Sequence, residues 1–289
     1  MDQKEFNRRD FVRYGTLGLA GLYAAGLPRA EELTAAVTGK KRPGIALQLY
    51  SVRKDCEKDL PGTTAAVAKM GYQGVEFAGY YGRTAKDLKK LLDDNGLKCV
   101  GTHIALETML GDKLKETVEF NKVLGNKYLI CPWMPEERRK NRAGWLECAK
   151  LFNEISDKVK PEGMMVGYHN HNFEFKPFDG EAPWDSFFGN THKEVIMQFD
   201  TGNAVEGGGD AIPFLKKYPG RAITVHMKEY SKTNPDALVG EGDMKWKELF
   251  HLCETIAGTE WYIIEQESGK CAPMDCVAQC YKSFVKLMG

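Results

Sequence analysis

Short apolar runs rich in β-branched residues alternate along the chain with longer segments whose apolar positions recur every three or four residues. The first pattern is typical of buried strands, and the second is typical of amphipathic helices. The strand pattern occurs at 44–50, 74–77, 98–103, 127–131, 163–166, 195–199, 222–225 and 261–264. The helical pattern occurs at 63–70, 84–95, 112–124, 143–159, 210–217, 245–256 and 275–287, with a short helix at 183–190.

Regular alternation of strands with helices predicts a parallel sheet built from βα units. Such units fill roughly 245 residues here, close to the usual ~250 of a (β/α)8 TIM barrel. A doubly wound open sheet is the alternative, but no glycine-rich GxGxxG turn follows the first strand. We therefore expect a single α/β domain, a (β/α)8 barrel at 44–289, preceded by a linker at 31–43.

Polar residues gather where four successive apolar runs end. In a closed barrel the carboxyl ends of the strands meet at one mouth, so such residues come together there. A single polar residue at such a position is more often a loop or core residue whose hydrogen bonds are satisfied within the protein. Together, imidazoles and carboxylates indicate a metal site or an acid–base site. These residues are His169, His171 and Glu174 after the fifth run, then Asp200, His226 and Glu265 after the next three.

Three more residues are candidates for the mouth of the barrel. Lys228 lies two positions past His226, so it shares a face with His226 and could hold or protonate a substrate oxygen. His103 ends the third run and Glu76 lies near the end of the second. The alternatives are a surface lysine for Lys228 and satisfied core groups for the other two.

The charge and cysteine content narrow the class of protein. The chain has 40 basic and 40 acidic residues, and this balance argues against a nucleic-acid partner, which requires clustered Lys and Arg. Eight cysteines include no CxxC pair, which argues against a zinc knuckle or a thioredoxin-like centre. Cys271, Cys276 and Cys280 lie close together near the C-terminus, and a disulfide among them would be compatible with export.

The first thirty residues differ from the rest of the chain. Arg8 and Arg9 precede Asp10-Phe11 and a weakly apolar, Gly/Ala-rich run at 14–27, in the manner of a twin-arginine export motif. The run is too short and too glycine-rich for a transmembrane helix. We expect residues 1–30 to be an export signal, the mature protein to be periplasmic or exported, and no stable membrane insertion after cleavage. The alternative is a basic amphipathic N-terminus on a cytoplasmic protein.

Several motifs along the chain resemble those of a known family. The chain is similar to the sugar phosphate isomerase/epimerase-like branch of the xylose isomerase-like TIM barrel superfamily, over about residues 44 to 285. These motifs are specific for the family but not for a substrate. They are Gln48-Leu49-Tyr50-Ser51-Val52-Arg53, the 169–175 segment, Asp200-Thr201-Gly202-Asn203, His226-Met227-Lys228-Glu229-Tyr230, Gly240-Glu241-Gly242-Asp243 with Trp246, and Ile264-Glu265-Gln266.

The resemblance implies one divalent metal ion, Mn²⁺, Co²⁺, Zn²⁺ or Mg²⁺, held by Glu, Asp, His and Glu from strands five to eight. Asp200, His226 and Glu265 match three of these ligands. The family's strand-five glutamate aligns nearest His169, and Glu174 follows a few residues later. We favour Glu174 as the fourth ligand, reaching back from the loop, with His169 as the alternative.

The resemblance also implies a function. It indicates a metal-dependent sugar isomerase or epimerase that moves the proton α to a carbonyl through a metal-stabilised enediolate. The alternative is a 3-keto-sugar lyase or dehydratase that acts by β-elimination at the same site, and a further alternative is a non-catalytic carbohydrate-binding barrel. The partner is a small-molecule carbohydrate, and homo-oligomerisation stays open.

Roles for individual residues follow from the same resemblance. Asn203 stands where many relatives carry a histidine that helps to hold the substrate, so substrate inference from ketose epimerases is weakened. The expected catalytic residues are Glu174, Glu265, His171 and Lys228, and the expected substrate contacts are His103, His169, Asn203 and Glu76.

The export signal leads to a direct test. Changing Arg8 and Arg9 together to Lys should leave the protein in the cytoplasm with its N-terminus uncleaved, because a twin-arginine route depends on the arginine pair. Cell fractionation with mass spectrometry of the N-terminus measures both effects. Unchanged periplasmic delivery of the double variant would rule out this route.

Overall fold

The computed structural model describes residues 42–178, 180–267 and 269–289. Residues 43–289 form one compact unit. The expected export signal at 1–30 and most of the expected linker lie outside the described residues. Within the described ranges, the helices are too short or too polar to span a lipid bilayer.

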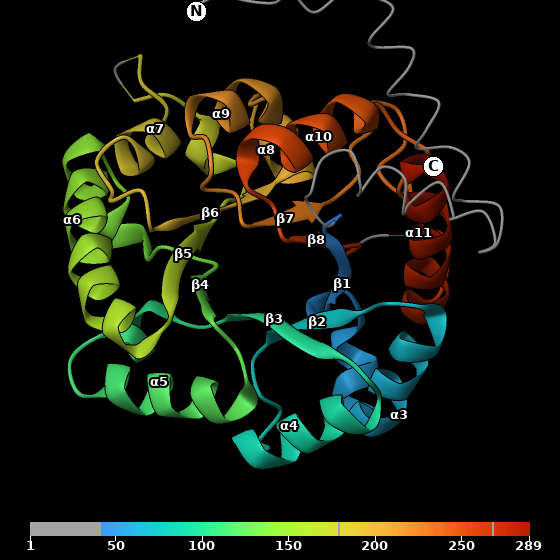
Figure 1. Ribbon diagram of the computed structural model, residues 1–289. Coiled ribbons are helices and arrows are strands. Elements are labelled where there is room, and N and C mark those ends of the chain that lie inside the picture. The colour runs from blue at the N-terminus through green and yellow to red at the C-terminus, as the bar shows by residue number, and fades with distance from the viewer. Residues whose placement is uncertain (1–41, 179, 268) are drawn as a thin grey trace, which may run out of the picture. The chain divides into compact units, whose positions relative to one another are not determined.

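Eight parallel strands close into a barrel in the order in which they occur along the chain (Figure 1). The first strand pairs with both the second and the eighth, which closes the sheet. The predicted (β/α)8 fold is confirmed. The strands are β1 (Gly44–Gln48), β2 (Gly74–Ala78), β3 (Lys98–His103), β4 (Tyr128–Cys131), β5 (Met165–His169), β6 (Ile196–Asp200), β7 (Thr224–Met227) and β8 (Trp261–Ile264).

Helices surround the strands on the outside of the barrel (Figure 1). The α-helices are α3 (Arg53–Met70), α4 (Ala85–Asp94), α5 (Lys113–Leu124), α6 (Arg142–Val159), α7 (Pro183–Phe188), α8 (Thr201–Glu206), α9 (Ala211–Lys217), α10 (Trp246–Leu252) and α11 (Pro273–Met288). Shorter turns are η1 (Leu49–Val52), η2 (Leu106–Met109), η3 (Glu136–Arg138), η4 (Lys160–Glu162), η5 (Phe173–Phe175) and the π-helical η6 (Cys253–Ala257).

The bounds of several elements differ from the sequence prediction, and two of these differences are informative. The fifth strand was expected at 163–166, but β5 begins at Met165 because Gly163 adopts φ +73° and caps the preceding turn. This shift places His169 inside the strand instead of after it. The first helix was expected at 63–70, but α3 begins at Arg53 and continues through a kink at Asp59, two residues before Pro61. The sequence pattern marked only the part after this kink.

The two faces of each strand have different surroundings. Outward-facing side chains pack against the helices, where Trp145, Phe152, Tyr168 and Phe187 form a fully buried aromatic group. Inward-facing side chains alternate with them. Near the strand starts, small apolar clusters fill the interior, formed by Ala46, Val100 and Ile263, by Tyr128, Ile130 and Ile196, and by Trp261 packed against both. Polar inward positions are thereby confined to the other end of the barrel.

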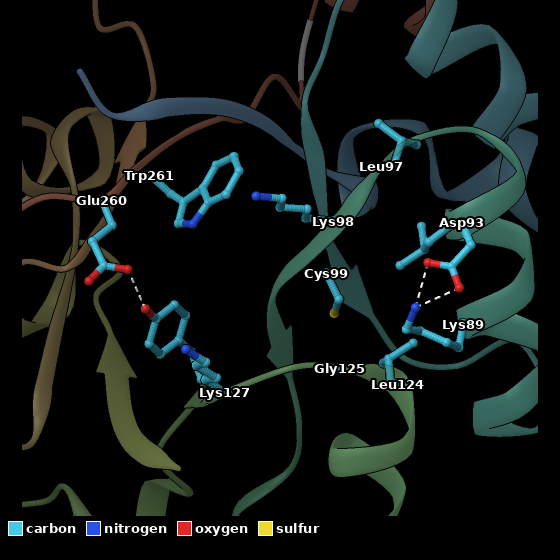
Figure 2. Close-up of a pocket in the computed structure, with 12 residues that line it drawn as sticks. Lys89, Asp93, Leu97, Lys98, Cys99, Leu124, Gly125, Lys127, Glu260 and Trp261 are labelled. Atoms are coloured by element: carbon cyan, nitrogen blue, oxygen red, sulfur yellow. Dashed lines mark hydrogen bonds and ion pairs between the residues drawn. The ribbon is translucent and has the colours of Figure 1, made fainter. Parts of the chain in front are cut away.

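A cavity of about 430 Å³ lies at the strand starts (Figure 2). Lys98, Tyr128 and Trp261, the first residues of β3, β4 and β8, contribute to its wall. Tyr128 donates a 2.5 Å hydrogen bond to Glu260 across it. Conserved features on this face of TIM barrels contribute to stability, whereas chemistry takes place at the opposite face. The cavity is therefore no candidate for the active site.

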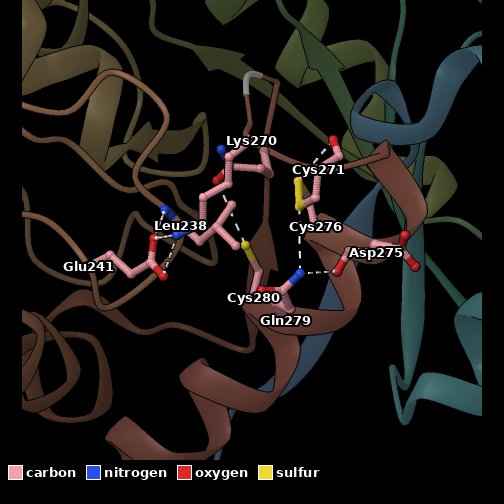
Figure 3. The surroundings of a disulfide bond; sticks show 9 residues. Leu238, Glu241, Lys270, Cys271, Asp275, Cys276, Gln279 and Cys280 are labelled. Carbon is pink, nitrogen blue, oxygen red and sulfur yellow. Dashed lines mark hydrogen bonds and ion pairs between the residues drawn. A yellow bond between two sulfur atoms is a disulfide. The ribbon is translucent and has the colours of Figure 1, made fainter.

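A disulfide ties the loop after β8 to the start of α11 (Figure 3). The sequence grouped three cysteines here, and the structure pairs Cys271 with Cys276. Cys280 remains a buried free thiol whose sulfur lies 3.7 Å from the side-chain oxygen of Gln266. Lys270, next to the disulfide, forms an ion pair with Glu241. Through these contacts the segment that follows Glu265 is fixed to the rest of the barrel.

Candidate metal centre

Four ligand-type side chains converge where β5 to β8 end. His169 is the last residue of β5, Asp200 is the last of β6, His226 lies in β7 and Glu265 follows β8. One potential ligand atom from each lies within 4.8 Å of the others, and all four side chains are buried. Asp200 is the register partner of His226 on the neighbouring strand, so strand pairing itself brings this pair together.

Glu174 does not join this cluster, which corrects the preference for it as the fourth ligand. Its carboxylate accepts the hydroxyl of Tyr168 at 2.5 Å and the backbone N–H of His171 at 2.9 Å. Tyr168 precedes His169 in β5, so its side chain points to the outer layer of the barrel. A carboxylate bound to Tyr168 is turned away from the interior, and His169, the alternative that the sequence left open, lies in the fourth position.

The cluster has unsatisfied atoms that suit a cation. Within the described residues, Nδ1 of His169 and Oδ2 of Asp200 are buried without a hydrogen-bond partner. Such atoms are costly unless an ion or another group satisfies them. Two imidazoles and two carboxylates are ligands that Mn²⁺, Co²⁺, Zn²⁺ and Mg²⁺ accept to different degrees. The residues present therefore fit a divalent cation.

The electrostatics of the cluster are strongly perturbed. Burial raises the pKa of Asp200 to about 7 against the opposing effect of Lys228. Burial lowers the pKa of His169 well below its usual range, so this ring is neutral and keeps a lone pair for a cation. Burial opposes protonation of His226 as well, but the carboxylates of Glu76 and Glu265 raise its pKa to about 10.

A hydrogen-bonded layer inside the barrel supports the cluster from below. Glu76 has no exposed surface and contacts His226, His103, Gln48 and Gln198. Burial opposes ionisation of Glu76, but the neighbouring His103 and His226 hold its pKa near 2. Both of its oxygens have partners beneath the cluster, whereas the sequence assigned Glu76 to the substrate contacts.

His103 lies beside the cluster. Its ring stacks on His226 with centroids 5.3 Å apart and lies 4.9 Å from the ring of His169. Its Nε2 lies 2.6 Å from the side-chain oxygen of Gln198. The side chain is 10% exposed, so His103 lines the opening of the barrel at the C-terminal ends of the strands.

His171 lies nearer the surface than the cluster. Its ring lies 5.3 Å from that of His169 and meets Trp133 edge-on at 4.9 Å. Its Nδ1 has no partner among the described residues, and burial lowers the pKa of this histidine to about 4. A neutral imidazole with a free nitrogen can accept a proton from a molecule in the mouth.

Lys228 and Asn203 complete the set that the sequence proposed. The Lys228 ammonium lies 4.0 Å from Glu265 and forms an ion pair with Glu267. Burial opposes its charge, yet Glu265 and Asp200 raise its pKa above the usual range, so it is a cation beside the cluster. The carboxylate of Asp200 accepts the backbone N–H of Asn203 and caps α8, and the side-chain amide of Asn203 donates to the carbonyl of Asn170. Asn203 therefore orders the strand-six end.

Sequence reasoning missed two members of the supporting layer, Gln48 and Gln198. Both are buried amides in otherwise apolar strands. The signal was available, because Gln198 lies two residues before Asp200 and therefore shares its face of β6. Counting back by two from each strand-end ligand would have found it.

The buried Glu174 generates a stability test. Burial raises its pKa to about 7, above the usual range of a glutamate, despite hydrogen bonds from Tyr168 and His171. Because the folded pKa is raised, the stability gained from protonation is full below about 4.5 and is lost as pH rises towards 7. Glu174→Gln mimics the protonated group, so urea unfolding at pH 5 and pH 8 should show a pH-dependent loss in the wild type about 3 kcal/mol larger than in the variant. Equal pH dependence in both proteins would contradict this assignment.

Residues 64–279 match the model of the xylose isomerase-like TIM barrel family. The inosose dehydratase of Erwinia tasmaniensis is 23% identical over 250 residues, which cover 73% of this chain and 83% of that protein.

Two crystal structures of sugar phosphate isomerase/epimerases from Parabacteroides distasonis are also similar. One superimposes with a TM-score of 0.74 and 24% identity over 91% of this chain and 100% of that chain. The other has a TM-score of 0.73 and 28% identity over 84% of this chain and 97% of that chain. Because the family match covers most of the barrel that carries the cluster, the chain belongs to the xylose isomerase-like TIM barrel family.

Proposed function

We propose that this protein is a divalent-metal-dependent isomerase or epimerase that moves the proton α to a carbonyl group of a small carbohydrate. The observation that carries the proposal is the cluster of His169, Asp200, His226 and Glu265, with two orphaned buried atoms. The names of the relatives, inosose dehydratase and sugar phosphate isomerase/epimerase, support the same chemical class. All of them act on polyhydroxylated rings or sugars.

The cluster would hold the ion through two nitrogen and two carboxylate ligands. When bound, the ion supplies Lewis-acid polarisation of a carbonyl oxygen and a template for the neighbouring hydroxyl. These contributions make the α-proton more acidic. The side chains around the cluster then decide where that proton goes.

Glu265 and His171 are the groups that can move the proton. Burial would raise the pKa of Glu265, but Lys228 and His226 hold it below the usual range, so its carboxylate is ionised. His171 presents a free nitrogen from the segment after β5, and Glu265 follows β8. Because β5 and β8 are not neighbours in the barrel, the two groups can approach a substrate from different sides. Removal on one face and return on the other give epimerisation.

Dehydration by β-elimination is a second candidate, favoured by Lys228. Its ammonium lies beside Glu265, where it can stabilise negative charge on an oxygen that leaves the β-carbon. The inosose dehydratase relative carries out a reaction of this type by name. Elimination and epimerisation share the first proton removal, so the same residues serve both.

We also propose that the protein acts after export, because Arg8 and Arg9 precede a weakly apolar run.

The ligand set leads to a prediction on metal content. The purified wild-type protein should contain about one divalent ion per chain, by elemental analysis with mass-spectrometric detection, because one cluster of four ligands is available. Asp200→Ala, His226→Ala and His169→Ala should each lose the ion. Glu174→Gln is the matched control and should retain it, because Glu174 contacts Tyr168 instead. Full occupancy in Asp200→Ala or His226→Ala would show that the ion is bound elsewhere.

The proton transfer leads to a second prediction. Ketoses, 3-keto-sugars and inososes incubated with the enzyme in D₂O should include a substrate that gains deuterium next to its carbonyl, seen by NMR. His171→Ala should lower turnover by about 10²-fold, the usual scale for losing a positioned acid or base, and keep the ion. The control is His192→Ala, since His192 lies on the surface and pairs only with Asp157 among the described residues. Loss of the ion in His171→Ala would make His171 a ligand and overturn this role.

The products separate the two candidate reactions. An epimer or isomer keeps the molecular mass of the substrate apart from deuterium, whereas elimination lowers it by one water or one alcohol. A protein that binds sugars but exchanges no deuterium and forms no product would be a carbohydrate-binding barrel.

A further inference from the structure

Glu76 is a charged group at the centre of the barrel, below the cluster. Its Oε2 lies 2.6 Å from Nε2 of His226 and accepts the amide of Gln48 at 2.7 Å. Its Oε1 accepts the amide of Gln198 at 2.7 Å. These partners come from β1, β6 and β7, while Glu76 belongs to β2. Contacts from several sides of the barrel thus fix the carboxylate in a single position.

The neighbouring strand is shaped to leave room for this carboxylate. A Cβ atom on Gly101 would lie 2.3 Å from Oε1 of Glu76, so β3 must have a glycine there. The register between β2 and β3 shifts between Val75 and Glu76, which are paired with Cys99 and Gly101.

A buried carboxylate is costly, since removing an ion from water costs several kcal/mol even after the protein relaxes. Packing alone therefore gives no reason for a glutamate at this point. The position of Glu76 relative to His226 does give a reason. One ring nitrogen of His226, Nδ1, faces Asp200 and Glu265 in the cluster, and the other, Nε2, faces Glu76.

We propose that Glu76 is a positioning residue that accepts the Nε2–H of His226 and thereby fixes the tautomer whose Nδ1 lone pair points into the cluster. The inference rests on the metal site of the proposed function. It adds a group that never contacts the ion or the substrate. Histidines that bind metals usually donate their other N–H to a carboxylate or carbonyl, which orients the ring and increases its basicity.

The same carboxylate also connects the cluster to His103. Nε2 of His103 lies 3.1 Å from Oε2 of Glu76, the oxygen that faces His226. Its Nδ1 lies 3.3 Å from the amide nitrogen of Gln48. Loss of Glu76 would remove one contact from each of His103 and His226, whose rings stack on each other.

Two substitutions of Glu76 test the proposal in the full-length protein. Glu76→Gln removes the charge and keeps an acceptor, whereas Glu76→Met keeps the volume and removes the acceptor. Competition titration with a Zn²⁺ chelator should show affinity for Zn²⁺ lowered about tenfold in Glu76→Gln and about 100-fold in Glu76→Met, the usual range for losing the partner of a ligating histidine. Thr224→Val is the matched control, because it removes a hydroxyl bonded to Gln198 and leaves the Glu76–His226 contact intact.

A second measurement separates positioning from a purely structural role. ¹⁵N NMR of the histidine rings in Zn²⁺-loaded protein, with His226 assigned from His226→Ala, should show the wild-type ring protonated at Nε2 and Zn²⁺-bound at Nδ1. Glu76→Met should lose this signature while urea unfolding shows that the protein is folded. Were Glu76→Met not to fold, the same two readouts on Glu76→Gln would decide the question.

The outcomes distinguish this inference from the proposed function. Wild-type Zn²⁺ affinity in Glu76→Gln together with an unchanged His226 ring overturns the positioning role and leaves the metal site standing. Equal loss of affinity in Thr224→Val also overturns it, because any disturbance of the layer would then have the same effect. A wild-type protein that binds no Zn²⁺, Mn²⁺, Co²⁺ or Mg²⁺ overturns the metal site and the positioning role together.

Discussion

The balance of buried charge is the constraint on which the centre of this molecule depends. Glu76, Asp200 and Glu265 are carboxylates in a space from which water is excluded, and the Lys228 ammonium and the imidazole of His226 face them. Unpaired, such charges would destabilise the fold by several kcal/mol each. The barrel satisfies most of them through cross-strand contacts and leaves an acidic, imidazole-lined position that a cation can complete. Stability and reactivity therefore depend on the same few side chains.

The alternation of side chains along each strand divides the barrel interior into two halves. On β6, Ile196, Gln198 and Asp200 face inward in sequence, from apolar to amide to carboxylate. The apolar half packs around Trp261, and the polar half carries the cluster at the strand ends. This gradient explains how a fold held together by its core can still present ionised groups to a substrate at one end.

Much of this arrangement follows from local sequence patterns. The periodicity predicts the strands and their order, and the strand-end positions of Asp200, His226 and Glu265 depend only on where apolar runs stop. The direction of the Glu174 side chain could not be predicted in this way. After Asn170 the chain leaves the strand, and alternation no longer tells which way a side chain points. Its actual partner, Tyr168, faces the helices, and only the three-dimensional path of the loop shows this.

The position of Glu76 beneath the cluster could not be predicted for a different reason. Its bond to His226 joins residues 150 positions apart, across the interior of the barrel. A side chain near the end of a strand can reach the mouth or lie beneath it, and the difference depends on strand register. The shift opposite Gly101 decides the matter, and irregular register leaves no regular pattern in the sequence.

Closure of the sheet between β1 and β8 also sets an order of events during protein synthesis. Glu265 follows the last strand, and that strand must pair with both β1 and β7 before its end has a fixed position. The carboxylate of Glu265 can therefore take its place beside His226 only after β8 has been synthesised and paired. Ribosome-bound fragments that stop before β8 would lack one of the four side chains of the cluster.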